Sequence, residues 1–305
     1  MGSHLVDRFV AAGYAVDVVD NLITGHRENL QAHLASGAVR LFEVPAEAFE
    51  PPTLSYRHVL HLASPASPVD FGPRAVEILQ ANSQGTLNLL EIARKSGARF
   101  LFASTSEVYG DPEVHPQTED YRGNVDPLGP RGPYDEGKRF GEAATMAYHR
   151  NFGLDVRIVR IFNTYGPRMR LDDGRVVPNF LRSLLEHRPL TVYGDGRQTR
   201  SFCYVSDLVE GLFRYATLDR PRWRVINLGN PREITILELA EIIQRVTGRQ
   251  VGIEFQPLPP QDPRRRQPDI RRARTLLNWE PRVPLEEGLQ RTWEWALALN
   301  QGEGP

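Results

Sequence analysis

Over its first half, the sequence alternates short β-branched apolar runs with segments of helical spacing, and this alternation constrains the fold more than any other feature. It is typical of parallel strands joined by crossover helices. We therefore predict an α/β protein with a doubly wound parallel sheet. The expected strands lie at 14–20, 57–63, 98–104 and 154–162, and the expected helices at 76–95 and 135–152.

The second half of the sequence has a looser pattern, in which Pro, Gly and Arg become more frequent after about Gly166. The segment 256–269 is rich in Pro and Arg, so we predict a surface loop there that faces an anionic group. The simplest architecture is two lobes that share one core, residues 1–166 and 167–305, with some segments of the second lobe returning to the first. Further helices are expected at 178–186, 206–216, 235–247 and 285–299.

Composition excludes several classes of protein. The 305 residues include 37 basic and 38 acidic ones, for a net charge of -1, which argues against a nucleic-acid partner. The single cysteine, Cys203, cannot form an internal disulfide or a paired-cysteine metal site, so we expect an intracellular protein without a metal. No apolar run reaches the roughly 18 residues of a membrane span, so no membrane partner is expected. Together these features predict a cytoplasmic location.

Lysine is rare in this sequence: only Lys95 and Lys138 occur, and the other 35 of the 37 basic residues are arginine. An ammonium can change its pKa and share a proton, whereas a guanidinium stays charged. Tyr134 lies four residues before Lys138, so on a helix both side chains can meet one ligand. The cation would favour the phenolate and lower the pKa of Tyr134, making it a usable base. Chance spacing on the surface is the alternative.

Hydroxyl and carboxyl groups follow the strand expected at 98–104. Thr105, Ser106 and Glu107 lie at its carboxyl end, where ligands bind in open α/β sheets, although a simple turn would also use such residues. Asp20 ends the first expected strand. It is suited to accept hydrogen bonds from an adenosine ribose, which would select NAD over NADP, or else to cap a turn.

Several segments carry a resemblance to a known family. The chain resembles the extended short-chain dehydrogenase/reductases that act on nucleotide sugars, and within them the enzymes that decarboxylate UDP-glucuronate. The similarity runs from Gly2 to about Leu297. The motifs are those at 61–68, 105–112, 134–138, 160–168, 192–196, 200–202, 261–263 and 266–269.

The resemblance implies a Rossmann-type fold, with NAD bound mainly by residues 1–166 and a nucleotide sugar bound mainly by residues 167–305. It also implies a homodimer. Tyr134 would accept a proton, Lys138 would contact the nicotinamide ribose, and Thr105 would assist at the sugar O4. Ser106, Glu107 and Arg200 would complete the catalytic set. NAD would contact Gly2, Asp20, Asn21, Thr24, Gly25, Leu62, Ala103, Tyr134, Lys138 and Thr164, and the UDP-sugar would contact Asn88, Asn163, Arg175, Arg200 and Arg266.

The family shares a first step in which NAD accepts a hydride from C4 of the sugar. The resemblance implies that 4,6-dehydratases carry an acid where this chain has Ser106, so loss of water would lack its proton donor. A 4-keto glucuronate can instead lose CO2 into the ketone without that acid. We therefore expect UDP-glucuronate to give UDP-xylose and CO2. A UDP-hexose 4-epimerase, a 4,6-dehydratase and a non-catalytic nucleotide-sugar-binding homologue remain alternatives.

The amino terminus departs from the family pattern. Members of the family begin with a strand and a glycine-rich turn that hold the pyrophosphate of NAD. This sequence matches only the last glycine of that turn, at Gly2. Either the start of the sequence was assigned too late, or this is a truncated form whose doubly wound sheet lacks its first strand and which binds NAD weakly.

Overall fold

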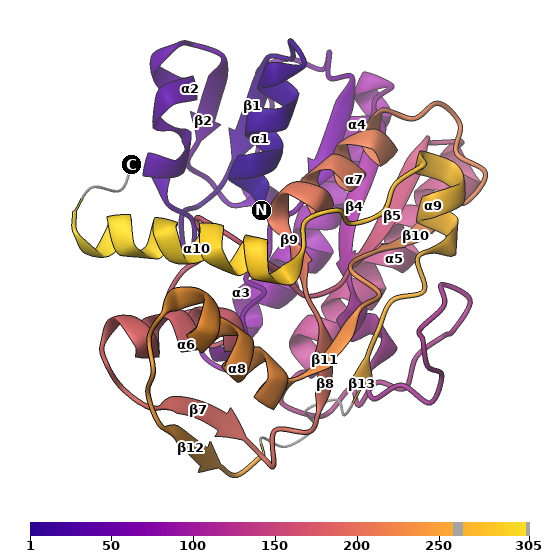
Figure 1. Cartoon of the computed structure of the whole chain (residues 1–305). Helices are drawn as coiled ribbons and strands as arrows, with labels where there is room; N and C mark the ends of the chain where they lie inside the picture. The colour runs from indigo at the N-terminus through magenta and orange to yellow at the C-terminus, as the bar shows by residue number, and fades with distance from the viewer. Residues whose placement is uncertain (259–264, 303–305) are drawn as a thin grey trace.

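Four parallel strands form the centre of the molecule, in the order β10–β5–β4–β3, and a second parallel pair, β1–β2, lies beside them (Figure 1). The computed structural model describes residues 1–258 and 265–302. Every pairing within these two sheets is parallel, which confirms the predicted fold class. The strands are β1 (Val16–Val19), β2 (Val39–Phe42), β3 (His58–His61), β4 (Arg99–Thr105), β5 (Val156–Ile161) and β10 (Val225–Leu228).

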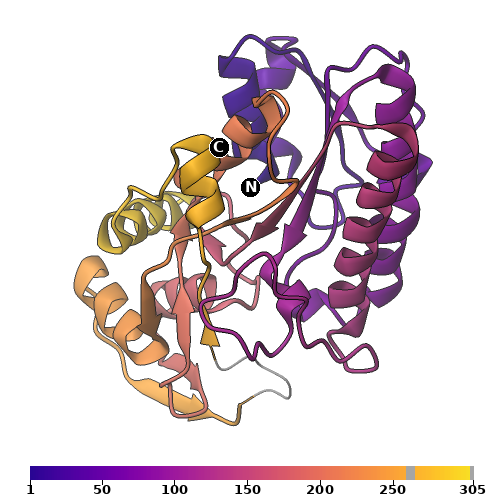
Figure 2. The same cartoon turned by 90° about the vertical axis from the view of Figure 1, so that its right-hand side faces the viewer.

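Helices cover both faces of the central sheet. Figure 2 shows α4 and α5 along one face, with α1 and α7 on the other. The helices of this lobe are α1 (Gly2–Ala11), α2 (Gln31–Ala35), α3 (Ala75–Gln80), α4 (Thr86–Ser96), α5 (Gly132–Phe152), α7 (Val205–Thr217) and α9 (Arg271–Leu277). Short helical segments are η1 (Arg27–Leu30), η2 (Ala46–Ala48), η3 (Pro68–Asp70), η4 (Ala81–Gly85) and η5 (Ser106–Tyr109).

Strand β4 lies in the middle of the core and is buried from Phe100 to Thr105. Such continuous burial is typical of a parallel strand with both faces covered. Helix α5 comes close to it at Gly141, where a Cβ atom would lie 2.1 Å from the ring of Phe102. This close approach places the Tyr134–Lys138 side of α5 beside the carboxyl end of β4.

A smaller lobe, at the bottom of Figure 1, is built from the second half of the chain. Thr235 and Glu238 cap its helix α8 reciprocally. One apolar cluster joins the two lobes, because Leu101 and Val159 of the central sheet belong to it together with Leu239 of α8. The elements are α6 (Val176–Leu185), α8 (Ile236–Thr247), α10 (Leu285–Asn300), β6 (Thr164–Tyr165), β7 (Leu190–Tyr193), β8 (Thr199–Ser201), β9 (Cys203–Tyr204), β11 (Glu233–Thr235), β12 (Ile253–Gln256) and β13 (Arg265–Arg266).

Strands β1 and β3 face each other without pairing. Within the described part of the chain, β1 pairs with β2 alone and β3 with β4 alone. Residues of both strands line one shared cavity. The cavity therefore extends between these two strands.

Two expectations need correction. The helix expected at 76–95 is interrupted by the π-helical segment η4, between α3 and α4. The segment 256–269 is not simply a surface loop, because Arg266 lies in β13, pairs with β8 and is only 3% exposed. Pairing with β8 and contacts with acidic partners bury it. Residues 259–264, with the motif at 261–263, lie outside the described residues.

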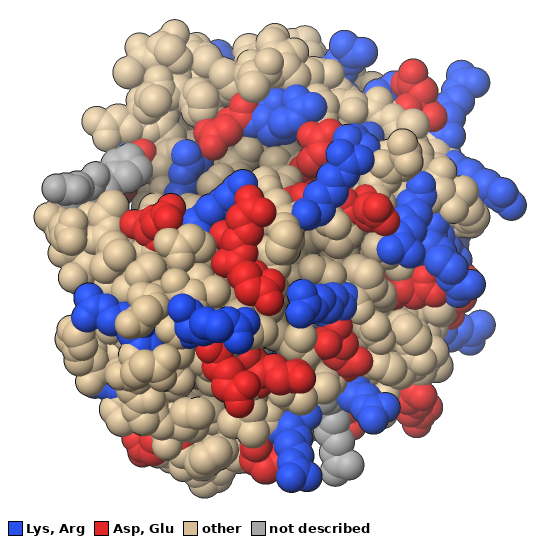
Figure 3. Space-filling view, in the orientation of Figure 1, with Lys and Arg blue, Asp and Glu red and all other residues tan. Residues whose placement is uncertain are grey.

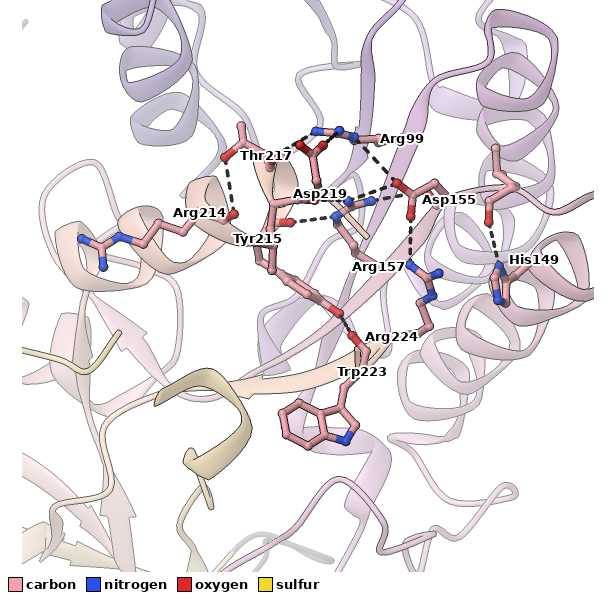
Figure 4. A network of polar contacts seen from close by, with 12 residues as sticks. Arg99, His149, Asp155, Arg157, Arg214, Tyr215, Thr217, Asp219, Trp223 and Arg224 are labelled. Carbon is pink, nitrogen blue, oxygen red and sulfur yellow. Dashed lines mark hydrogen bonds and ion pairs between the residues drawn. The ribbon is translucent and has the colours of Figure 1, made fainter. Parts of the chain in front are cut away.

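A polar network ties the amino ends of the strands to the end of α7, on the side away from the carboxyl ends (Figure 4). Asp155 forms ion pairs with Arg99, Arg157 and Arg224. The Arg157 side chain is fully buried and donates to the carbonyl of Tyr215 at 2.7 Å. On the face drawn in Figure 3, basic and acidic side chains are interspersed.

Candidate active site

A cavity of about 1100 Å³ opens at the carboxyl ends of β1, β3, β4 and β5 and continues between β1 and β3. Seventeen of the residues predicted to bind NAD, to bind the sugar or to act in catalysis line it. They are Gly2, Asp20, Asn21, Thr24, Gly25, Leu62, Ala103, Thr105, Ser106, Glu107, Tyr134, Lys138, Asn163, Thr164, Arg175, Arg200 and Arg266. The fold therefore gathers residues from across the sequence around one space.

Asn88 is the predicted site residue that the structure does not bring to this cavity. Its side-chain amide donates to the carbonyls of Ala46 and Phe49, both at 2.9 Å. It therefore ties α4 to the segment around η2.

Tyr134 and Lys138 lie one helical turn apart at the start of α5, as their spacing predicts. The Lys138 ammonium is 5.9 Å from the centre of the Tyr134 ring and donates to the carbonyl of Ala103 at 2.9 Å. The ring of Phe71 stacks on Tyr134 with a centroid distance of 4.7 Å. Both members of the pair are nearly inaccessible to water, with 5% and 3% exposure.

Burial controls the protonation of this pair. It lowers the pKa of Lys138 from 10.5 to about 7. Burial also raises the pKa of Tyr134, and a hydrogen bond from Thr105 only partly opposes that rise. The expected lowering of the Tyr134 pKa is therefore wrong, because loss of hydration outweighs the hydrogen bond from Thr105 and the charge of Arg175.

A charged cluster lies at the end of β4, around η5. Arg266 donates to the Ser106 hydroxyl at 2.9 Å, to a Glu107 carboxylate oxygen at 2.5 Å and to the carbonyl of Gly110 at 3.1 Å. Arg131 pairs with the other Glu107 oxygen. The Thr105 hydroxyl accepts from the Glu107 backbone amide at 3.3 Å and caps η5. Ser106 and Glu107 are thus held by arginine.

The pKa values of the Glu107 and Asp135 carboxyl groups are shifted in opposite directions. Burial by itself would raise the pKa of Glu107, but Arg266 and Arg131 lower it to about 2. Burial, together with the charge of Glu107, raises the pKa of Asp135 to about 7. Asp135 is not among the residues that line the cavity. The carboxyl group that does face the cavity here is therefore ionised at neutral pH.

At the far end of the cavity, the carboxylate of Asp20 accepts from the backbone amide of Leu22 at 2.8 Å. Asn21 accepts in the same way from Ile23 at 3.2 Å. Both residues thus shape a turn, and both also line the cavity. A Cβ atom on Gly25 would lie 2.9 Å from an Asp20 carboxylate oxygen, so a side chain here would displace that carboxylate.

The arginines predicted for the sugar nucleotide lie on the side of the smaller lobe. Arg175 pairs with Asp173, donating to Oδ2 at 2.7 Å, and Arg200 donates to the carbonyl of Thr199 at 2.8 Å. Arg200 and Arg266 are paired positions of β8 and β13, so their backbones are adjacent. Two basic side chains therefore reach the cavity from neighbouring strands.

Sequence reasoning missed two polar residues, one in contact with the cluster and one near the cavity residue Ser64. Arg131, one turn before Asp135 on the same stretch of chain, contacts Glu107. Asn82, fully buried in η4, donates to the Ser64 hydroxyl and to the carbonyl of Ile78, both at 2.8 Å. No signal in the sequence indicated Asn82, because it lies among small and polar residues in η4. No local pattern connects Arg131 to Glu107.

Two further properties concern the described residues alone. Among residues 1–258 and 265–302, no group of three or more His, Cys, Asp or Glu side chains is arranged to hold a metal ion. No helix in the same two ranges has the length and apolar character needed to cross a membrane.

Comparison with known proteins gives concordant results. UDP-glucuronic acid decarboxylase 1 of Arabidopsis thaliana is 53% identical over 291 residues, which are 95% of this chain and 66% of that protein. The chain thus spans just under two thirds of this relative's length. A UDP-glucuronic acid 4-epimerase from Bacillus cereus, solved with UDP-glucuronic acid and NAD, has a TM-score of 0.86 and 28% identity, covering 98% of this chain and 96% of that one.

The chain is also similar to a second enzyme of known structure and matches the sequence model of a protein family. UDP-glucose 4-epimerase from Thermotoga maritima, solved with UDP-glucose, has a TM-score of 0.88 and 30% identity, covering 98% of this chain and 96% of that one. The sequence pattern named "NAD dependent epimerase/dehydratase family" matches residues 1–229. Together with the cavity at the carboxyl ends of a parallel sheet, this match shows that the chain belongs to the NAD dependent epimerase/dehydratase family.

Proposed function

We propose that this protein converts UDP-glucuronate into UDP-xylose and CO2, with NAD as a cofactor that is reduced and reoxidised within one cycle. The observation that carries the proposal is the group formed by Ser106, Glu107 and Arg266 beside Thr105 and Tyr134. It presents a hydroxyl, an ionised carboxylate and a guanidinium to the cavity. The relatives named for decarboxylation of UDP-glucuronic acid support the same assignment.

The residues around the cavity suit NAD. Asp20 offers a carboxylate at the end of β1, as a ribose diol requires, and Gly25 keeps the backbone close beside it. The first turn of α1 reaches the cavity at Gly2, and helix amino termini favour phosphate. Lys138 supplies a buried ammonium at the other end. When bound, the nicotinamide would take a hydride from the sugar and later return it.

Tyr134 and its neighbours would handle the proton on the sugar O4. Tyr134 would accept this proton as a phenolate, a form that burial disfavours and that the positive charge of a bound nicotinamide would favour, and Thr105 would orient the oxygen through its hydroxyl. Lys138, whose pKa is lowered to about 7 by burial, exchanges a proton at neutral pH and so helps to set the charge of the pair. The product of this step is a 4-keto sugar that still carries its C6 carboxylate.

The same site favours loss of CO2 over loss of water. Elimination of water at C6 requires a proton donor, but Glu107 is ionised, with a pKa of about 2 in the protein without ligands. Decarboxylation requires none at C6. As the C5–C6 bond breaks and CO2 leaves, the electron pair of that bond forms the C4 enolate. C5 then takes a proton from water before the ketone is reduced. Arg266 contacts Ser106 and Glu107 next to Thr105, so we place it at the sugar end of the cavity rather than on the diphosphate.

For the UDP moiety we propose Asn163, Arg175 and Arg200. All three line the cavity on the side of the smaller lobe. A planar guanidinium matches phosphate oxygens because it donates two hydrogen bonds at once.

One incubation tests the proposal against its rivals. UDP-glucuronate labelled with ¹³C at C6, mixed with the protein and NAD, should release labelled CO2 and give a product of the mass of UDP-xylose. An isomer of unchanged mass would instead indicate epimerisation. Unchanged substrate would indicate a non-catalytic homologue. Tyr134→Phe is the matched control, since it removes a single hydroxyl and should abolish release of CO2. Dehydration of UDP-glucose would contradict the assignment.

We also propose that the protein is a homodimer, joined through one helical face. This face consists of Val76, Leu79, Leu87 and Phe140, which are 63%, 42%, 41% and 42% exposed on α3, α4 and α5. Helices α3 and α4 both pack against α5, so the four side chains lie on neighbouring helices. Apolar groups gathered in this way favour burial against a second copy.

Sedimentation equilibrium tests this dimer. Leu87→Glu should give monomers at concentrations where the wild type is dimeric, whereas Leu128→Glu, at an isolated site that is 95% exposed, should not. A wild-type protein that sediments as a monomer would exclude the dimer. The cytoplasmic location is likewise a proposal, supported by the one cysteine, Cys203, being buried and unpaired.

A further inference from the structure

The position of Arg266 depends on contacts outside its own strand. Strand β13 has only two residues, Arg265–Arg266, paired with β8. The Arg266 guanidinium nevertheless meets Ser106 and Glu107, about 160 residues earlier in the chain, with little access to water. Because these residues are far apart in the sequence, other contacts must hold β13 in place beside η5.

Gln117, which is 0% exposed, holds the residues that follow Arg266. Its backbone amide donates to the carbonyl of Gln267, and its side-chain oxygen accepts from the Gln267 amide, both at 2.9 Å. Its carbonyl accepts from the Asp269 amide at 2.9 Å. Gln117 itself is anchored, because its side-chain amide donates to the carbonyl of Val114 at 2.8 Å. Three hydrogen bonds thus hold the two residues that flank Pro268.

Asn227 of β10 connects Gln117 to η5. Its side-chain amide donates to the carbonyls of Gln117 and Asp269, at 2.9 and 3.1 Å. Its side-chain oxygen accepts from the hydroxyl of Tyr109, the last residue of η5, at 2.8 Å. Burial raises the pKa of Tyr109 to about 12, so this phenol keeps the proton that it donates. Asn227 and Tyr109 are both 0% exposed.

These contacts form a closed ring that begins at Glu107 and returns to it through Tyr109, Asn227, Gln117 and the Arg266 segment. We propose that Tyr109, Asn227 and Gln117 are positioning residues that hold the Arg266 guanidinium against Ser106 and Glu107. None of the three is among the residues that line the cavity. The inference rests on the proposed function, because it takes Arg266 to act on the reacting sugar.

The test removes one hydroxyl from the ring. Tyr109→Phe deletes the 2.8 Å hydrogen bond to Asn227 and leaves a buried ring of the same size. Tyr215→Phe is the matched control, because Tyr215 is also 0% exposed and donates one 2.8 Å hydrogen bond, to the carbonyl of Trp223 in the remote network of Figure 4. We expect Tyr109→Phe to lower kcat about 10-fold or more with KM within about 2-fold, since misplaced groups slow catalysis steeply. Tyr215→Phe should leave kcat within about 2-fold.

A double-mutant cycle separates positioning from general loss of stability. If Tyr109 acts through Arg266, Tyr109→Phe should have no further effect on kcat in an Arg266→Gln background. Additive losses would overturn the proposal, as would equal effects of Tyr109→Phe and Tyr215→Phe. An Arg266→Gln protein with full activity would instead contradict the proposed function.

Hydrogen exchange gives a readout that needs no turnover. The Gln267 and Asp269 amides should exchange at least about 10-fold faster in Tyr109→Phe, and still faster in Gln117→Met, than in the wild type. Tyr215→Phe should leave them unchanged. Wild-type protection of both amides in Tyr109→Phe would refute the positioning role, whatever reaction the protein performs.

Discussion

Replacing Lys138 with methionine is expected to inactivate the protein and, at neutral pH, to stabilise it. The Lys138 ammonium is 3% exposed and has one hydrogen bond, to the carbonyl of Ala103. Methionine has nearly the same length but carries no charge. Greater stability combined with loss of activity is expected where a charged group is buried for catalysis.

The size of the effect follows from the pKa of Lys138, which burial lowers from 10.5 to about 7. At 1.36 kcal/mol for each tenfold change, the ionised side chain costs the folded state about 5 kcal/mol at low pH. The variant also leaves the Ala103 carbonyl without its donor, at a cost of about 1–3 kcal/mol. The net gain in the free energy of unfolding should therefore be about 2–4 kcal/mol below pH 7.

The sign of the pH dependence is opposite to that of a lysine in a salt bridge, whose pKa is raised. Between pH 7 and 10.5, the unfolded chain binds more protons at Lys138 than the folded protein does, so this group makes wild-type stability rise with pH. The methionine variant has no such group. Its advantage over the wild type should therefore shrink by about 2 kcal/mol from pH 7 to pH 9.

Urea unfolding of both proteins at pH 7 and pH 9 measures this difference. Lys95→Met is the control, because the Lys95 side chain is 53% exposed and its removal should change the free energy of unfolding by less than about 0.5 kcal/mol. A Lys138→Met protein that is less stable than the wild type by the same amount at both pH values would refute the buried-charge account.

Four other predictions test the site and the fold. Lys138→Arg should lower activity by about 100- to 10,000-fold if the ammonium itself is required, and full activity in this variant would contradict that requirement. Glu107→Gln should lower kcat far more than it weakens binding of UDP-glucuronate in calorimetry, and an equal loss in both would show a role in binding alone. Asp155→Asn should lower the free energy of unfolding by about 2 kcal/mol with kcat unchanged, because Arg157 keeps its burial but loses a charged partner; a wild-type urea midpoint would exclude this. A chain extended before Met1 by a strand and a GxxGxxG turn should fill the space between β1 and β3 and bind NAD more tightly in calorimetry, whereas equal affinity would show the extension to be dispensable.

Much of the fold and part of the site follow from local patterns. Alternating runs predicted β1, β3, β4 and β5 and helix α5, because periodicity reports which face of an element is buried, but they did not predict β2 or β10. The four-residue spacing placed Tyr134 and Lys138 together because a helix brings such residues onto one face. The segment after β4 was predicted at the site because ligands bind at the carboxyl ends of parallel strands. None of these inferences required contacts between distant parts of the chain.

The tertiary structure alone decided the charge state of the site and the partners of its key arginine. Sequence predicted a lowered pKa for Tyr134, whereas burial raises it, and burial depends on everything packed around the side chain. Arg266 was expected in an exposed loop, yet a two-residue strand and the contacts of Gln117 bring it to Glu107. Asn88 was expected at the sugar but ties α4 to the segment around η2. Sequence thus determined much of the secondary structure and the motif positions, because these depend on neighbouring residues, while strand pairing, hydration and long-range hydrogen bonds depended on the completed fold.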